Sequence, residues 1–134
     1  MSTSGAAQAL SADAAIKLCD AYLDGLTRGD LEGVLALFAD NATIEDPVGT
    51  EIKTGTDELR AFYQIACDSI TAAVRQGPPR IAGTDIAFAF VATIGSGPEA
   101  MQIDIIDVFE SDASGKVAAM RAYWGPDNMR AHSG

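Results

Sequence analysis

The run Met101-Gln102-Ile103-Asp104-Ile105-Ile106-Asp107-Val108-Phe109 has the pattern of a long β-strand with one apolar face. Side chains alternate between the two faces of a strand, so Ile103, Ile105, Asp107 and Phe109 share one side, while Asp104 belongs to the other. Asp107 is the one carboxylate on the apolar side. Burying it ionised is costly, so it is expected to find a strong partner or to take up a proton. A neutral carboxyl can donate a hydrogen bond to a substrate oxyanion, which makes Asp107 a functional candidate; the alternative is a buried ion pair, with Arg121 as the partner.

The rest of the chain predicts helices first and strands afterwards. Ser11 or Asp13 can cap a helix that runs to about residue 28, and Asp30 can cap a short second helix that Asp40-Asn41 closes. Residues 42–46 read as a brief strand before Pro47, and Thr56 can cap a third helix to about residue 68. Strands are then expected over residues 70–76, 80–82, 86–94, 101–109 and 117–124. This order predicts an α+β domain with three helices packed on a curved, mostly antiparallel sheet around a cone-shaped pocket.

The composition limits the possible partners. The chain has 134 residues, a length that fits a single domain over 1–134. Its formal charge of −10 disfavours nucleic acid and anionic membranes as binding partners. No apolar run is long enough to span a membrane, and the N-terminus lacks a signal-peptide pattern. We therefore expect a cytoplasmic protein with a flexible leader (1–10) and a flexible tail (127–134). Cys19 and Cys67 are expected to be buried free thiols, and no metal site is expected.

The sequence does not favour histidine chemistry, because the single histidine, His132, is the third residue from the end of the given sequence. Carboxylates and tyrosines remain. Asp46 shares a strand face with Ile44 and can point into a pocket, although an aspartate before proline is more often a turn residue. Tyr22 and Tyr63 lie on apolar helix faces, and core packing is their simpler explanation. Core packing is equally the default for Tyr123 and for Met120 and Trp124, which share a strand face that can also form the wall of a site for a flat apolar ligand.

Three separated segments together resemble the ketosteroid isomerase family, the steroid Δ5-isomerases. They are Ala42-Thr43-Ile44-Glu45-Asp46-Pro47-Val48-Gly49, Ile103-Asp104-Ile105-Ile106-Asp107-Val108 and Met120-Arg121-Ala122-Tyr123-Trp124. The resemblance extends over most of the chain and implies the cone-shaped α+β barrel of the nuclear transport factor 2-like and SnoaL-like superfamily. It also implies that the active protein is a homodimer that needs no cofactor.

The resemblance also implies roles for individual residues. The catalytic base falls on Asp46, the oxyanion-hole tyrosine on Tyr22 and the protonated oxyanion-hole acid on Asp107. Tyr63 matches a tyrosine that supports Tyr22, and Met120 and Trp124 are expected to bind substrate. Ketosteroid isomerase is the well-known example of an aspartic acid that an apolar site keeps neutral, so this part of the expectation comes from the family.

Other functions remain open at this point. The chain departs from familiar members in its leader, its 77–82 loop and its 95–100 hairpin. A polyketide cyclase or dehydratase of this superfamily usually needs a pocket histidine. An epoxide hydrolase of this fold needs an Asp-Arg-Asp relay, for which Arg121 is available only if its strand pairs in a suitable register. A binding module for steroid-like ligands would not need Tyr22, Asp46 and Asp107 together.

Overall fold

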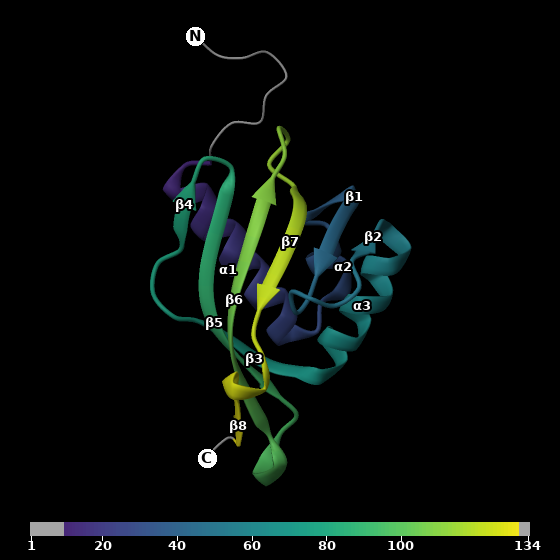
Figure 1. Ribbon diagram of the computed structural model, residues 1–134, viewed down its shortest axis with the longest axis vertical. Helices are drawn as coiled ribbons and strands as arrows, with labels where there is room; N and C mark the ends of the chain where they lie inside the picture. Colours follow the sequence, from purple (N-terminus) through teal and green to yellow (C-terminus); the bar gives the residue numbers. More distant parts are fainter. Residues whose placement is uncertain (1–9, 132–134) are drawn as a thin grey trace.

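The computed structural model describes residues 10–131, which form an α+β fold with three α-helices and a mixed β-sheet (Figure 1). The helices are α1 (Ala12–Arg28), α2 (Leu31–Leu35) and α3 (Thr56–Ser69). All of them precede the main run of strands, as the sequence predicted. No helix in this part of the chain combines the length and the apolar character that a membrane span requires.

Two of the three helices begin at the N-cap residues that the sequence predicted. Ser11 caps α1 by accepting a hydrogen bond from the backbone N–H of Ala14 at 3.1 Å, and Asp30 caps α2. The predicted cap of α3 was wrong: Gly55 is the N-cap, and Thr56 is the first helical residue. The Thr56 hydroxyl instead donates to the carbonyl oxygen of Asp40 at 3.3 Å, which ties α3 to the first strand.

The strands hydrogen-bond in the order β2-β1-β7-β6-β5-β3, with β4 attached to β5 and β8 to β6. They are β1 (Phe38–Glu45), β2 (Lys53–Thr54), β3 (Ile70–Arg75), β4 (Arg80–Ala82), β5 (Asp85–Ile94), β6 (Met101–Ser111), β7 (Val117–Tyr123) and β8 (Met129–Ala131). Only the β1–β7 pair among them is parallel. This pairing joins the first part of the chain to its last long strand.

Two segments differ from the sequence prediction. β1 begins at Phe38, so Asp40 and Asn41 lie inside the strand instead of closing the helical unit. Phe38 pairs with Val117 of β7, and this distant partner explains why the local pattern did not show the strand. Residues 126–128 form a 3-10 turn and β8 pairs with β6, although a flexible tail was predicted from residue 127. Residues 1–9 and 132–134, including His132, lie outside the described part.

The core lies on one face of the sheet, which we call the inner face. Ile103, Phe109 and Asp107 lie on the inner face of β6, and Phe88 and Ala122 pair directly with Asp107 from the strands on either side. All five residues are buried. Helix α1 crosses behind β5 and β6 in Figure 1 and contributes to the same hydrophobic core. The other side of the sheet, the outer face, carries Asp104 and Ile106.

Candidate active site

Asp46 comes directly after β1 and is held beside the end of β7. In the parallel pair, Glu45 lies opposite Arg121, and the backbone N–H of Val48 donates to the carbonyl oxygen of Ala122 at 2.8 Å. The backbone on both sides of Asp46 is therefore fixed to β7. The indole Nε1–H of Trp124 donates a 2.8 Å hydrogen bond to Oδ1 of Asp46. Asp46, the predicted base, is thus a half-buried carboxylate with a defined hydrogen-bond donor.

The electrostatic environment of Asp46 balances opposing effects. Burial raises the pKa of its carboxyl above the usual value, while the hydrogen bond from Trp124 and the positive charge of Lys53 lower it. The net direction is upward. A base with a raised pKa accepts a proton more readily than an exposed aspartate, provided that it still ionises at the working pH.

Tyr22 of α1 and Tyr63 of α3 form a buried pair. Their hydroxyl oxygens lie 3.0 Å apart, and either can be the donor. The ring of Tyr22 also packs edge to face against Phe109, with centroids 5.0 Å apart, and so stands over the inner face of β6. Burial is the main cause that raises the pKa of both phenols well above 10, so both keep their protons at neutral pH.

Asp107 is 1% exposed, and its Oδ1 has no hydrogen-bond partner among the described residues. The proposed ion pair with Arg121 is not formed. Arg121 lies opposite Val108 on the outer face and pairs with Glu110. Burial, and then the negative charge of Asp46, raises the pKa of Asp107 well above its usual value. Without a counter-ion, the neutral acid is the favoured form.

The four polar residues influence one another electrostatically. The charge of Asp46 contributes to the raised pKa values of Tyr22, Tyr63 and Asp107. The structure therefore brings together one half-buried carboxylate, a buried acid and two buried phenols, contributed by α1, α3, β6 and the segment after β1. This combination can place a base and neutral hydrogen-bond donors around one small molecule.

A largely apolar cavity of about 390 Å³ opens beside this group. Asp46 and Trp124 lie in its wall, and α3 contributes Phe62 and Ile65. Its remaining lining residues come from α3, β5, β6 and the start of β3: Ala66, Ser69, Ile70, Ala92, Ile94, Ile103 and Ile105. The volume is in the range of small-molecule sites. Asp107 follows Ile105 on the same strand face, roughly 7 Å farther along β6.

The structure separates the predicted site residues into two groups. Asp46 and Trp124 reach the cavity wall, whereas Tyr22, Tyr63, Asp107 and Met120 are buried and do not line the cavity. The sequence interpretation missed Ile65, which is 68% exposed on α3, one turn after Phe62. The signal was present: Phe62, Ile65, Ala66 and Ser69 follow the three- and four-residue spacing of one helix face.

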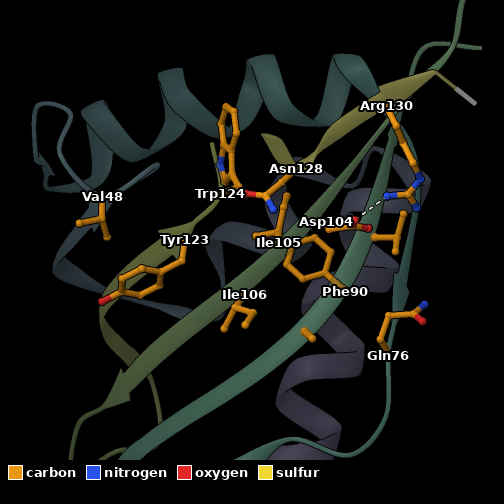
Figure 2. Close-up of a pocket in the computed structure, with 12 residues that line it drawn as sticks. Val48, Gln76, Phe90, Asp104, Ile105, Ile106, Tyr123, Trp124, Asn128 and Arg130 are labelled. Carbon is orange, nitrogen blue, oxygen red and sulfur yellow. Dashed lines mark ion pairs between the residues drawn. The ribbon is translucent and has the colours of Figure 1, made fainter. Parts of the chain in front are cut away.

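A larger hollow of about 760 Å³ contains residues of the outer face. Figure 2 shows Tyr123 and Ile106 on one side of it and the ion pair between Arg130 and Asp104 on the other. Trp124 borders both hollows, and in Figure 2 it points away from Tyr123. The charged groups here neutralise each other, and Asp46 does not line this hollow. The smaller cavity is therefore the candidate active site.

Comparison with known proteins identifies the family of this chain. The model of the SnoaL-like domain family matches residues 19–126. The chain belongs to this family. The SnoaL-like chain is 33% identical over 108 residues to the steroid Delta-isomerase of Nocardioides simplex, which corresponds to 81% of this chain and 87% of that protein. It is also 32% identical over 112 residues to the epoxide hydrolase LasB of Streptomyces lasalocidi, or 78% of this chain and 39% of that protein.

The fold has a solved counterpart. The structure of SalBIII, an epoxide hydrolase/cyclase-like enzyme in pyran ring formation of the polyether salinomycin, superposes with a TM-score of 0.82. The superposition covers 90% of this chain and 97% of SalBIII at 24% sequence identity. At this identity the likeness establishes the shared fold alone. The relation to the steroid Delta-isomerase points to an isomerase, although the other two relatives show that this fold also hosts hydrolases and cyclases.

Proposed function

We propose that this protein is a steroid Δ5-isomerase that converts Δ5-3-ketosteroids to Δ4-3-ketosteroids, with its site in the cone-shaped barrel that the family resemblance predicts. The observation that supports this most strongly is the unpartnered Oδ1 of Asp107, which is buried on the inner face among the described residues. A neutral acid in such a place can donate to an oxyanion that forms in the adjoining cavity.

The proposed reaction is an intramolecular proton transfer. Ionised Asp46 removes a proton from the carbon between the 3-keto group and the Δ5 double bond, and the electron pair moves through the conjugated system onto the ketone oxygen. Tyr22 and neutral Asp107 donate hydrogen bonds to the resulting dienolate, which requires the ketone oxygen to reach past the residues that line the cavity toward the inner face of β6. Asp46 then returns the proton two carbons farther along. The proton count balances, so no cofactor takes part, and one base serves both carbons because the flat intermediate stays in place.

Other side chains support these roles. Tyr63 holds the hydroxyl of Tyr22 through the 3.0 Å contact, and Trp124 holds Asp46. Phe62, Ile65 and Ile105 offer apolar surface to the steroid rings, and this burial supplies most of the binding free energy. Met120 belongs to the buried core cluster and does not line the cavity. Its role is to shape the site without touching the substrate.

The geometry of Arg121 favours the isomerase over an epoxide hydrolase. A relay of the Asp-Arg-Asp type needs the guanidinium between two acids in the pocket, but Arg121 lies on the outer face with Glu110. The residues that line the cavity include no arginine or histidine. A cyclase or dehydratase that uses histidine would therefore lack its main catalytic group in the described part of the chain.

The test is a direct assay of isomerisation. The protein is mixed with a Δ5-3-ketosteroid, and the absorbance of the conjugated enone is followed. We expect turnover by the wild type, and steroid binding without turnover by Asp46→Asn. Glu45→Gln is the matched control, because Glu45 is the neighbouring carboxylate and bonds to the backbone N–H of Gly49 at 2.9 Å. Near-normal turnover by Asp46→Asn would exclude Asp46 as the base, and a silent wild type would exclude the activity.

A further inference from the structure

Lys53 of β2 lies on the same side of the sheet as the proposed base. In the antiparallel β1–β2 pair, Lys53 is directly opposite Ile44, which is 1% exposed on the inner face. Directly opposite residues in a sheet point to the same face. Asp46 follows Ile44 by two residues, so the same alternation directs it to this side. Lys53 is half-buried, and its Nζ lies 5.6 Å from the ring centroid of Phe62.

Lys53 also lines a hollow next to the candidate cavity. A neighbouring hollow of about 300 Å³ is lined by Lys53, Phe62 and Ile65, with Ala61, Glu51 and Glu58 completing its wall. Phe62 and Ile65 line the candidate cavity as well, so the two hollows share one wall of α3. The side chain of Lys53 therefore lies in a hollow that adjoins the candidate cavity.

The charge of Lys53 is available to act on Asp46. None of the ion pairs in the described part of the chain includes Lys53, and it is the one basic residue among those that line the two hollows. Two acids share its hollow. Glu58 accepts a hydrogen bond from the backbone N–H of Thr54 at 2.8 Å, and Glu51 is exposed. The cation over the Phe62 ring thus stands in an acidic protein without a dedicated partner.

We propose that Lys53 keeps Asp46 ionised for catalysis and thereby sets the acidic limit of turnover. This inference rests on the proposed isomerase function. A half-buried carboxylate next to an apolar cavity tends to take up a proton, and a nearby positive charge opposes that tendency. The charge of Lys53 is one of the two influences that lower the pKa of Asp46; the other is the hydrogen bond from Trp124.

The other groups that face Asp46 do not supply this effect. Tyr22 from α1, Tyr63 from α3 and Asp107 from β6 are neutral when protonated, and burial holds all three in that state. Trp124 is neutral at every pH. Lys53 from β2 is therefore the positive charge on this side of the sheet that acts on the base, and it works through Asp46 as a positioning residue without contacting the reacting atoms.

The sign of the effect follows directly. Without the positive charge, the pKa of Asp46 rises, so a smaller fraction of the enzyme is ionised on the acidic side of the pH profile. For Lys53→Gln we expect kcat/KM to fall about threefold to tenfold on the acidic limb and to match the wild type within about twofold on the alkaline plateau. Lys53→Arg should restore the wild-type profile.

A second measurement reads the base without any substrate. Trp124 is the only tryptophan in the sequence, and its indole N–H bonds to Asp46, so its NMR signal reports the ionisation of that carboxyl. The midpoint of the indole titration should move to higher pH in Lys53→Gln and stay unchanged in Lys53→Arg. It should also stay unchanged in Lys17→Gln, which removes the same charge from an exposed site on α1. Asp46→Asn should abolish the titration.

The two measurements separate the inference from the function on which it rests. If the wild type fails to isomerise steroids but the indole titration shifts as expected, the proposed reaction is wrong and the electrostatic link between Lys53 and Asp46 stands. If Lys53→Gln leaves the titration midpoint unchanged, the inference is overturned, whatever the activity. A change in KM that is equal at every pH would likewise overturn it, because it would show that Lys53 contacts the substrate.

Discussion

The hydroxyl oxygens of Tyr22 and Tyr63 lie 3.0 Å apart, and their rings meet edge to face with centroids 5.9 Å apart. The contact joins α1 to α3, two helices whose tyrosines are 41 residues apart in the chain. Each phenol therefore hydrogen-bonds to another neutral phenol and not to a charged side chain. In the proposed function, this contact positions the hydroxyl of Tyr22 for donation to the oxyanion.

Replacing these tyrosines should separate donation from support. In Tyr22→Phe we expect kcat to fall about 100- to 1000-fold with little change in KM, because one donor to the oxyanion is lost only in the transition state. In Tyr63→Phe, the loss of one neutral hydrogen bond should cost about 1 kcal/mol, or roughly fivefold in kcat. Steady-state kinetics check both values, and a Tyr63→Phe defect as large as that of Tyr22→Phe would show that Tyr63 is the direct donor.

The two acids of β6 make a paired test of the face assignment. Asp107→Ala should reduce kcat strongly because the buried donor disappears, whereas Asp104→Ala should leave turnover close to the wild type. Asp104 pairs with Arg130 at 2.6 Å on the outer face, where its side chain is 53% exposed. The rate of enone formation, followed by absorbance, measures the turnover of both variants. Equal damage at the two positions would mean that the inner and outer faces contribute jointly to the reaction.

Asp107 should also make folding stability depend on pH. The pKa of Asp107 in the folded protein is raised well above the value near 4 expected in the unfolded chain. Between these two values the unfolded state releases a proton that the folded state keeps. The free energy of unfolding therefore falls as the pH rises through this window, by up to about 1.4 kcal/mol per pH unit.

Asp107→Asn removes this titration and keeps the size of the side chain. We expect the variant to gain stability relative to the wild type as the pH increases from about 4, with equal or lower relative stability below that pH. Urea unfolding at a series of pH values measures the difference. Parallel curves for the two proteins would contradict a neutral Asp107 in the folded state.

Two exposed isoleucines distinguish ligand binding from self-association. Ile65 of α3 lines the candidate cavity, and Ile106 lies on the outer face, with 68% and 49% of their surfaces exposed. Ile65→Asn should raise KM for the steroid by about tenfold through lost apolar contact and leave the oligomeric state unchanged. Ile106→Asn should leave KM unchanged. If the homodimer that the sequence predicted forms through the outer face, Ile106→Asn should weaken it.

Sedimentation of the wild type and both variants, together with their steady-state kinetics, provides the comparison. A monomeric wild type would contradict the dimer prediction. An Ile106→Asn protein that stays dimeric would place the interface elsewhere. A raised KM in Ile106→Asn without any change in sedimentation would instead show that the larger, outer hollow takes part in steroid binding.

Much of the fold was predictable because its signals are local. Ser11 and Asp30 cap helices through residues three positions away, and the alternation in residues 101–109 identifies the inner face of β6 from the sequence alone. Thr56 had an equally good cap signal, yet Gly55 took that position, because the Thr56 hydroxyl bonds to Asp40 of β1. A distant partner decided that helix end.

The residue types of the site were predictable from the sequence. The strand register and the hydrogen bonds between these residues were much less so. The alternation of strand faces marked Asp107 as unusual, but the register that places Arg121 opposite Val108 depends on how β6 and β7 pair. Likewise, Trp124 was expected in the pocket wall without its hydrogen bond to Asp46. That bond requires the parallel β1–β7 pairing, which no local pattern indicates.

The β1–β7 pairing has a consequence for how the molecule is made. Asp46 and Trp124 are 78 residues apart in the chain, so their bond can form only after both segments have left the ribosome. Contacts of such long sequence separation form late, since the intervening loop must close first. A nascent chain that stops before β7 would contain Tyr22, Tyr63, Asp46 and Asp107, but its first strand would lack the parallel partner that holds Asp46 in place.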